Sequence, residues 1–449
     1  MKILVLNGSP KGEGSVTLQS VLYLEKLFKE HTFSVLDVGQ KIKAFEKDFS
    51  KAKTEIENAD VLLFSYPVYT FIAPCQLHRF IELMKENKVD VSGKIATQIS
   101  TSKHFYDVTA HKYIQDNCED MGMKYIRGLS ADMDDLTLKK GQKELTDFFK
   151  HFCWCVENNV FEPVLPRAPK SDAVKVTLTQ EAENKNSGEV VIVTDLREDD
   201  KQLSSMIEAF RRVLPMESRV VNLREYPFKG GCLGCFRCAT DGKCVYKDGF
   251  DEFLRNKIQS SQAIVYAFSI KDHSMGALFK MYDDRQFCNG HRTVTMGMPV
   301  GYLVSGNYSA EMNLQMILEG RAQVGGNFLT GVATDETNPD AEIVALAKNL
   351  SYAIENKYVQ PSNFLGVGGM KIFRDLIYQM RGMMKADHKF YKEHGQYDFP
   401  QKKKFTIAMM YLVGAALSSE KVKAKMGNKM TEGMLMPYKN VLNKLDNDK

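Results

Sequence analysis

The sequence predicts two doubly wound α/β domains in tandem, each with a parallel sheet, followed by a helical C-terminal extension. Three observations carry this prediction. Short apolar runs alternate with helix-patterned runs about every 25 to 35 residues, which is typical of parallel sheets with right-handed crossovers. The pattern between residues 1 and 163 recurs in the same order between residues 188 and 358. The residues that follow, 359–449, are basic and have helical periodicity.

The size and the charge of the chain limit the kinds of protein that it could be. The chain has 449 residues, of which 44% are hydrophobic and 26% charged, values ordinary for a globular protein of two or three domains. A formal net charge of +4 is too small to indicate a nucleic-acid partner. Residues 361–449 hold 16 Lys and Arg against 8 Asp and Glu, so the tail carries +8 and the rest −4. If the chain makes a charge-driven contact with a membrane surface or a partner protein, the tail is where that contact is expected.

The compartment is predicted to be the cytoplasm. No secretory signal pattern opens the chain, and the longest apolar run, Phe405 to Leu417, is too short to span a bilayer. We expect that run to form a short buried helix. The nine cysteines, an odd number, indicate reduced thiols in place of a disulfide framework.

The first strand, loop and helix suit a phosphate group. An apolar strand at Ile3 to Leu6 leads into a loop, Asn7 to Ser15, and then into a helix. The start of a helix offers free N–H groups, and the loop adds hydroxyls and one lysine. Neither a P-loop nor a GxGxxG pattern is present, so one phosphate monoester such as that of FMN fits better than a dinucleotide. An ordinary strand-to-helix turn stays open as the alternative.

A second loop is predicted beside the first. Residues 33–38 form a strand, 41–58 a helix, and 59–64 a buried strand that ends in Ser65-Tyr66-Pro67-Val68-Tyr69. Ligands of parallel α/β sheets bind beyond the carboxyl ends of the strands, where residues 7–15 and 66–72 both belong.

These loops together resemble those of the flavodoxin-like NAD(P)H-dependent FMN reductases. The segment GSPKGEGSVT is similar to the family's phosphate loop, Tyr66 to Thr70 to its Pro-x-Tyr turn, and Pro74 to Glu82 to its next helix. The resemblance covers residue 1 to about 163 and implies NAD(P)H as the electron donor. It also implies FMN bound by Ser9, Lys11, Gly14, Ser15, Val16, Thr17, Pro67, Val68, Tyr69, Thr70, Ser100, Thr101 and Ser102.

The second half repeats the pattern but has lost the phosphate loop. A polar, proline-containing linker at 164–187 precedes it, and residues 190–194, 263–268, 275–285 and 300–306 correspond to elements of the first half. In place of the loop stands TDLREDDKQLS, with carboxylates at Asp195, Glu198, Asp199 and Asp200. Carboxylates at this range repel a phosphate, so we expect no FMN phosphate there.

The second half carries a four-cysteine motif instead. Cys232, Cys235, Cys238 and Cys244 follow the spacing CxxCxxCx5C, with glycines that permit tight turns. Such dense spacing is typical of iron–sulfur ligation and resembles that of the iron–sulfur flavoproteins, a branch of the same family that holds a [4Fe-4S] cluster. A zinc site and a turn without metal stay open as alternatives. The other cysteines are predicted to be core residues: Cys75, Cys118, Cys153, Cys155 and Cys288.

We therefore predict an NAD(P)H-dependent FMN oxidoreductase with FMN in domain 1–163 and a [4Fe-4S] cluster in domain 188–358, serving an unidentified acceptor. No catalytic side chain is expected, because the cofactors carry the chemistry, and His78, His104 and His273 are predicted to be structural. The alternative is a flavodoxin-like electron carrier that a protein partner reduces and that has no nicotinamide site.

Two further points concern assembly. Because members of the family commonly form dimers, either the two halves form a pseudo-dimer or the chain forms a homodimer. Residues 370–392 are expected to pack on their own domain, with docking on a membrane or a partner as the alternative.

Overall fold

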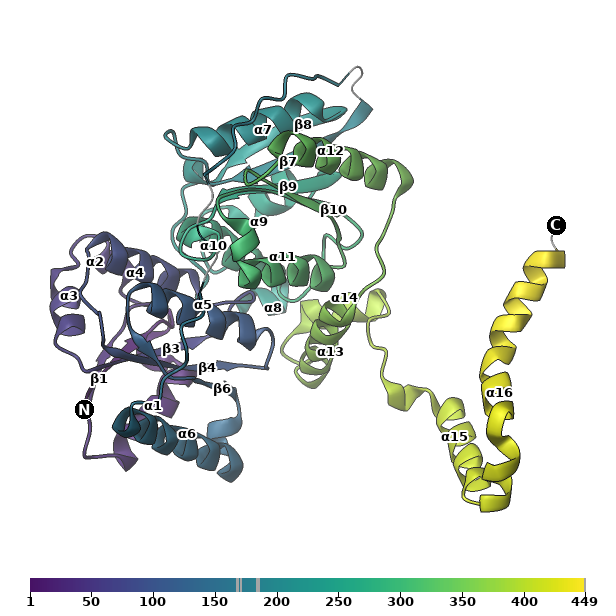
Figure 1. The fold of residues 1–449 in the computed structure, drawn as a ribbon, viewed down its shortest axis with the longest axis horizontal. Helices are drawn as coiled ribbons and strands as arrows, with labels where there is room; N and C mark the ends of the chain where they lie inside the picture. The colour runs from purple at the N-terminus through teal and green to yellow at the C-terminus, as the bar shows by residue number, and fades with distance from the viewer. Residues whose placement is uncertain (167–168, 170–171, 183–185, 448–449) are drawn as a thin grey trace. The chain divides into compact units, whose positions relative to one another are not determined.

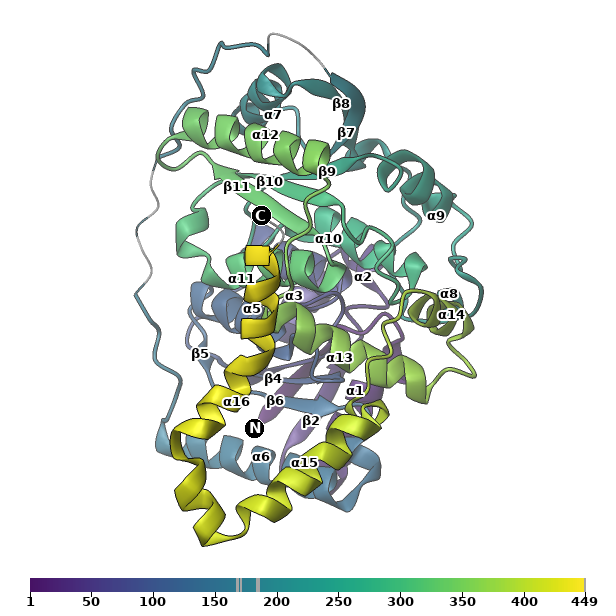
Figure 2. The ribbon, with the colours of Figure 1, turned by 90° about the vertical axis from the view of Figure 1, so that its right-hand side faces the viewer.

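The computed structural model describes residues 1–166, 169, 172–182 and 186–447. The chain divides into two compact units, Met1–Phe390 and Tyr391–Lys449. The first unit contains two parallel sheets, drawn in purple to blue and in teal to green in Figure 1, and Figure 2 gives the orthogonal view. No helix in the described part of the chain is both long enough and apolar enough to cross a membrane.

The first sheet is parallel throughout and has six strands. Its order is β2 (Thr32–Leu36), β1 (Lys2–Asn7), β3 (Val61–Pro67), β4 (Ile95–Ser102) and β5 (Lys124–Tyr125), with β6 (Leu129–Asp132) also paired to β4. Apolar residues of β1 and β3 alternate between two layers of helices. One layer contains α1 (Val16–Leu27) and α6 (Lys139–Asn158), and the other α2 (Ile42–Phe45), α3 (Ser50–Glu57), α4 (Cys75–Glu86) and α5 (Asp107–Asp120).

The second sheet has five parallel strands in the same relative order. They are β8 (Met216–Asn222), β7 (Asn186–Thr194), β9 (Ala263–Ser269), β10 (Pro299–Ser305) and β11 (Phe328–Thr334). One face packs on α7 (Lys201–Val213) and α12 (Pro339–Asn356), and the other on α9 (Phe250–Phe253), α10 (Gly276–Arg285) and α11 (Met312–Gly325). The predicted fold class is confirmed, since two parallel-sheet α/β domains precede a helical C-terminal region.

The two domains share one apolar core and cap each other's helices. Helix α4 packs against α10, and α5 against α11. Asp284 of α10 accepts a hydrogen bond of 2.8 Å from the N–H of Cys75 at the start of α4. Glu82 of α4 accepts one of 2.8 Å from the N–H of Ala277 at the start of α10. Each helix thus supplies a carboxylate to the positive end of the other helix.

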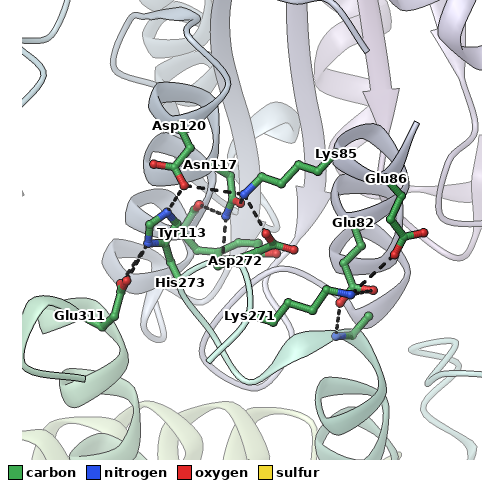
Figure 3. Close-up of polar contacts among 11 residues, drawn as sticks. Glu82, Lys85, Glu86, Tyr113, Asn117, Asp120, Lys271, Asp272, His273 and Glu311 are labelled. Atoms are coloured by element: carbon green, nitrogen blue, oxygen red, sulfur yellow. Dashed lines mark hydrogen bonds and ion pairs between the residues drawn. The ribbon is translucent and has the colours of Figure 1, made fainter. Parts of the chain in front are cut away.

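Ion pairs surround this contact (Figure 3). Lys271 lies 3.0 Å from Glu82, and Lys85 lies 2.8 Å from Asp272. The ring of His273, in the turn before α10, joins the end of α5 to the start of α11, because its Nε2 lies 2.6 Å from Asp120 and its Nδ1 2.9 Å from Glu311. Burial disfavours the charged ring, but the two carboxylates outweigh burial and raise the pKa of His273 to about 9.

The C-terminal helices do not share one environment. Helix α13 (Phe364–Gln379) packs on α11 of the second domain, and its Phe373 stacks on Phe105 of the first at 4.3 Å, so this part of 370–392 contacts both domains of the chain. A break separates it from α14 (Lys385–Glu393). Helix α15 (Lys404–Leu417) forms as expected, but its predicted burial is wrong, since Phe405 is 81% exposed. The described parts of the following helix, α16 (Glu420–Asn447), do not cover it.

We predict that His273→Gln destabilises the protein by about 1–3 kcal/mol near pH 6 and by much less near pH 10. The folded-state pKa of about 9 lies above the ordinary value of 6.5, so the stabilisation is complete below pH 6.5 and is lost as the pH rises through 9. Urea unfolding across this range measures it. His151→Gln, at an exposed histidine, is the control, and a pH-independent loss would contradict the assignment.

Candidate flavin and four-cysteine site

One cavity of about 340 Å³ lies between the two domains of the first unit. The first domain contributes the ends of β1, β3 and β4, and the second contributes the cysteine segment and the residues after α10. Of the residues predicted to bind FMN, these line it: Ser9, Lys11, Ser15, Val16, Thr17, Pro67, Val68, Tyr69, Thr70, Thr101 and Ser102. Gly14 and Ser100 do not; Ser100 is buried and lies 2.8 Å from His111. All four cysteines of the motif line the cavity.

The first loop forms a compact cradle at the start of α1. Ser15 caps this helix, its hydroxyl oxygen accepting the N–H of Leu18 at 3.4 Å. Thr17 joins the helix start to β4 through a hydroxyl contact of 2.6 Å with Thr101. Lys11 forms no ion pair with a carboxylate within the described part of the chain and lies 5.7 Å over the ring of Phe236. Hydroxyls, helix N–H groups and one cation at this point can bind a phosphate dianion.

The second loop is held by the second domain. Its residues Thr70 and Phe71 have left-handed backbones, with φ of 43° and 76°. The hydroxyl of Thr70 donates to Asp284 at 2.8 Å, and the ammonium of Lys280 donates to the carbonyl of Tyr69 at 2.9 Å. Lys280 and Asp284 are fully buried and also pair with each other. The turn therefore has its conformation fixed by α10 of the other domain.

The cysteine segment lies directly against this turn, and two glycines permit the approach. A Cβ on Gly231 would lie 2.2 Å from the sulfur of Cys75. A Cβ on Gly234, whose φ is +59°, would lie 1.8 Å from the hydroxyl of Tyr69. The amide of Gln76 also donates to the carbonyl of Cys232 at 3.2 Å. The segment is thus packed on the first domain by contacts that no larger residue would allow.

Arg285 fixes the start of the segment. It donates to the carbonyl of Gly230 at 2.8 Å, forms a bidentate pair with Asp248 at 2.8 and 2.9 Å, and lies 4.6 Å over the ring of Tyr246. This guanidinium is almost wholly buried, as is its carboxylate partner. Planar, paired and stacked contacts of this kind favour arginine over lysine.

The four thiols have the chemistry of a cluster-binding set. The N–H of Gly234 points at the sulfur of Cys232 at 3.4 Å, an interaction that stabilises a ligating sulfur. Burial and the neighbouring Cys235 raise the pKa of Cys238 to about 11, and burial also raises the pKa of Cys232. Among the described residues, no group of three or more cysteine, histidine or carboxylate side chains is arranged as a metal site. The four cysteines thus match an iron–sulfur ligand set in donor type and share one cavity, but the structure does not bring their sulfurs together as a metal site within the described residues.

Several residues of this site were missed by sequence reasoning. Cys75 and Cys288, predicted to be core residues, are buried, but Cys75 touches the cysteine segment and Cys288 lines the cavity. Helix α13 contributes part of the wall, and Phe373 of this helix contacts both Phe105 and His291. None of these contacts has a local sequence signal, because all of them join elements far apart in the chain.

The corresponding position in the second domain is occupied by a carboxylate. Asp200 caps α7, its side chain accepting the N–H of Leu203 at 3.2 Å, and it also bonds to Ser269. Burial raises the pKa of the neighbouring Asp195 to about 6, against the opposing effect of Arg224 and Arg197. The acidic residues thus lie at the helix start, as the sequence indicated.

The fold and the first loop define a doubly wound α/β domain whose first helix begins at a hydroxyl-rich loop that lines the cavity. Residues 1–132 match the family described as NADPH-dependent FMN reductase, so the predicted resemblance is confirmed for the first domain. The chain is an oxidoreductase, as predicted.

Known proteins resemble parts of the chain. An iron–sulfur flavoprotein from Archaeoglobus fulgidus is 27% identical over 175 residues, covering 36% of this chain and 78% of the relative. An FMN-dependent NADH-azoreductase from Bacillus anthracis, solved with FMN, has a TM-score of 0.28 and 15% identity, over 34% of this chain and 98% of its own. An NAD(P)H:quinone oxidoreductase from Methanothermobacter marburgensis has a TM-score of 0.27 and 13% identity, over 37% and 98%.

We predict that Gly234→Ala destabilises the protein by about 1–2 kcal/mol and weakens FMN binding. The new methyl group would need a left-handed backbone and the space of the Tyr69 hydroxyl. Urea unfolding and fluorescence titration with FMN measure the two effects. Gly368→Ala is the matched control, because its Cβ would have no neighbour within 4 Å. Equal behaviour of the two variants would contradict the packing described.

Proposed function

We propose that this chain is an NAD(P)H-dependent flavin oxidoreductase that binds FMN in the first domain and a [4Fe-4S] cluster in the second, and that delivers electrons to an acceptor still to be identified. One observation carries the proposal: the phosphate cradle, the Tyr69 turn and the four cysteines line the same cavity. The family matched by residues 1–132 supports the flavin part, and the iron–sulfur flavoprotein relative supports the cluster.

The FMN phosphate would be held by the cradle. Ser9, Ser15 and Thr17 are buried hydroxyls beside the helix start, and Lys11 adds the positive charge. The ring system would lie against Pro67 to Thr70, with Thr101 and Ser102 at its border. Bound FMN would supply hydride acceptance from the nicotinamide and single-electron release. The protein's part is to bind the ring, to fix the turn through Lys280 and Asp284, and to limit water with the apolar cavity wall.

The cluster would be held by Cys232, Cys235, Cys238 and Cys244, and when bound it would supply single-electron exchange. The tight packing of Gly231 and Gly234 on the first domain supports a short separation between the two cofactor positions. Zinc in the four-cysteine set is the alternative that a metal assay decides.

We further propose that the halves arose by internal duplication and form a pseudo-dimer. Glu82 and Asp284 exchange caps across the α4–α10 contact, and each lies seven residues after the N–H that the other caps. The turns before both helices share paired left-handed residues, Thr70 with Phe71 and Asp272 with His273. The proposed segments are 1–163, a connector at 164–187, 188–358 and the tail at 359–449. The nine free cysteines support the cytoplasm as the location.

Reduction by nicotinamide is tested by mixing the anaerobic protein with NADH or NADPH and following flavin absorbance. Prompt bleaching supports the reductase. An unchanged spectrum at about 1 mM donor, at the upper end of ordinary KM values, contradicts it and favours a carrier that a protein partner reduces.

We predict that Lys11→Met raises the Kd for FMN about tenfold and leaves the Kd for riboflavin unchanged, because only FMN has the phosphate that the ammonium would pair with. Titration of the apoprotein with each flavin measures both constants. Lys26→Met, at an exposed lysine near the other end of α1, controls for loss of charge. A parallel loss of riboflavin affinity would place Lys11 elsewhere in the site.

We predict that Cys235→Ser removes most of the iron and acid-labile sulfide, about four of each per chain in the anaerobic wild type, and leaves FMN content intact. Cys153→Ser is the matched control, because this half-buried cysteine lies outside the cavity. Zinc in place of iron in the wild type, or full iron in Cys235→Ser, would contradict the cluster assignment.

A further inference from the structure

Helix α15 is apolar on every side and exposed. After Lys404 its sequence, FTIAMMYLVGAAL, has hydroxyls only at Thr406 and Tyr411. The exposed fractions are 57% for Met410, 78% for Tyr411 and 70% for Leu412, residues that point in different directions around the helix. A helix that is apolar all round is typical of a protein core or a membrane.

The neighbouring described residues do not provide a core. In α16, the apolar side chains of Met434, Leu435 and Tyr438 are themselves exposed. A groove on a partner protein, or a second copy of the chain, would cover one face of α15 and leave the others in water. Lipid chains surround a helix on all the sides that enter them, so they match this distribution better.

Charge identifies the kind of lipid surface. Three consecutive lysines, Lys402, Lys403 and Lys404, precede the apolar run, and all three are exposed. Among the ion pairs of the described residues, these lysines have one carboxylate partner, the exposed Asp398, which lies 3.6 Å from Lys403. Lys402 donates to the carbonyl of Tyr397. A basic cluster adjoining an apolar helix is complementary to anionic headgroups above acyl chains.

Length limits the depth of insertion. With 14 residues α15 is about 21 Å long, shorter than the hydrocarbon core of about 30 Å that a spanning helix must cross. We propose that α15 anchors this chain to the surface of an anionic phospholipid bilayer, inserted at a shallow angle in one leaflet, with Lys402 to Lys404 at its start and Lys421 beyond its end at the headgroups. This inference is independent of the cofactors proposed above.

Co-sedimentation of the full chain with vesicles of phosphatidylcholine containing about 30% phosphatidylglycerol tests the proposal. We expect binding by the wild type and a partition coefficient about a hundredfold lower for the double variant Met410→Glu, Leu412→Glu. The matched control is Leu27→Glu, Leu138→Glu, which places two charges on exposed leucines of the first domain and should bind as the wild type does. Replacing the three lysines by glutamine should weaken binding at low salt and matter little at about 0.5 M salt.

Other outcomes overturn the anchor. These are no sedimentation of the wild type, equal sedimentation of the α15 double variant, or equal binding to pure phosphatidylcholine vesicles. Light scattering without vesicles measures the oligomeric state. If the wild type is an oligomer and the α15 double variant is a monomer, α15 is a contact between copies of the chain and not a lipid anchor. An unchanged circular dichroism spectrum and urea midpoint establish that each variant is folded, so loss of binding reports on the helix itself.

Discussion

The reciprocal caps between α4 and α10 are the contact on which the site depends. Asp284 and Glu82 are each almost completely removed from water, and each accepts an N–H at the start of the other domain's helix. A buried carboxylate is costly unless it is paired, and here each gains a helix N-terminus and a lysine, Lys280 for Asp284 and Lys271 for Glu82. Separation of the two domains would take the helix N-terminus from both carboxylates and Lys271 from Glu82, whereas Asp284 would keep Lys280 of its own helix.

This contact also positions the cavity. Asp284 accepts a hydrogen bond from the Thr70 hydroxyl, and Lys280 donates one to the Tyr69 carbonyl. The helix that joins the domains therefore also fixes the turn that follows β3. Arg285, the next residue, holds the start of the cysteine segment at Gly230. Helix α10 thus holds the Tyr69 turn through Lys280 and Asp284. Through Arg285 it also holds the start of the cysteine segment, so both line one cavity. A small movement of α10 would therefore displace both the turn after β3 and the start of the cysteine segment.

The sequence was sufficient for the sheets and the loops but not for the contacts between domains. Alternating apolar runs indicated both parallel sheets, and the hydroxyls from Ser9 to Thr17 marked the helix start that lines the cavity. Lys280 and Asp284 carried no such signal, because a buried ion pair and an exposed one have the same local pattern. The burial of α15 was predicted wrongly for a related reason: an apolar run indicates that water is excluded, not whether protein or lipid excludes it.

The asymmetry of the halves argues for one flavin site in each chain. At equivalent places in the two turns, Phe71 lines the cavity, whereas His273 is held between Asp120 and Glu311. At the equivalent helix starts, the first domain offers hydroxyls and Lys11, and the second offers the carboxylate of Asp200. Ion pairs of His273 and the helix cap by Asp200 thus occupy the positions where a second flavin would have to bind. The two sheets share their strand order, yet the second domain contributes its cysteines and Arg285 to the cavity that the first domain's loops line.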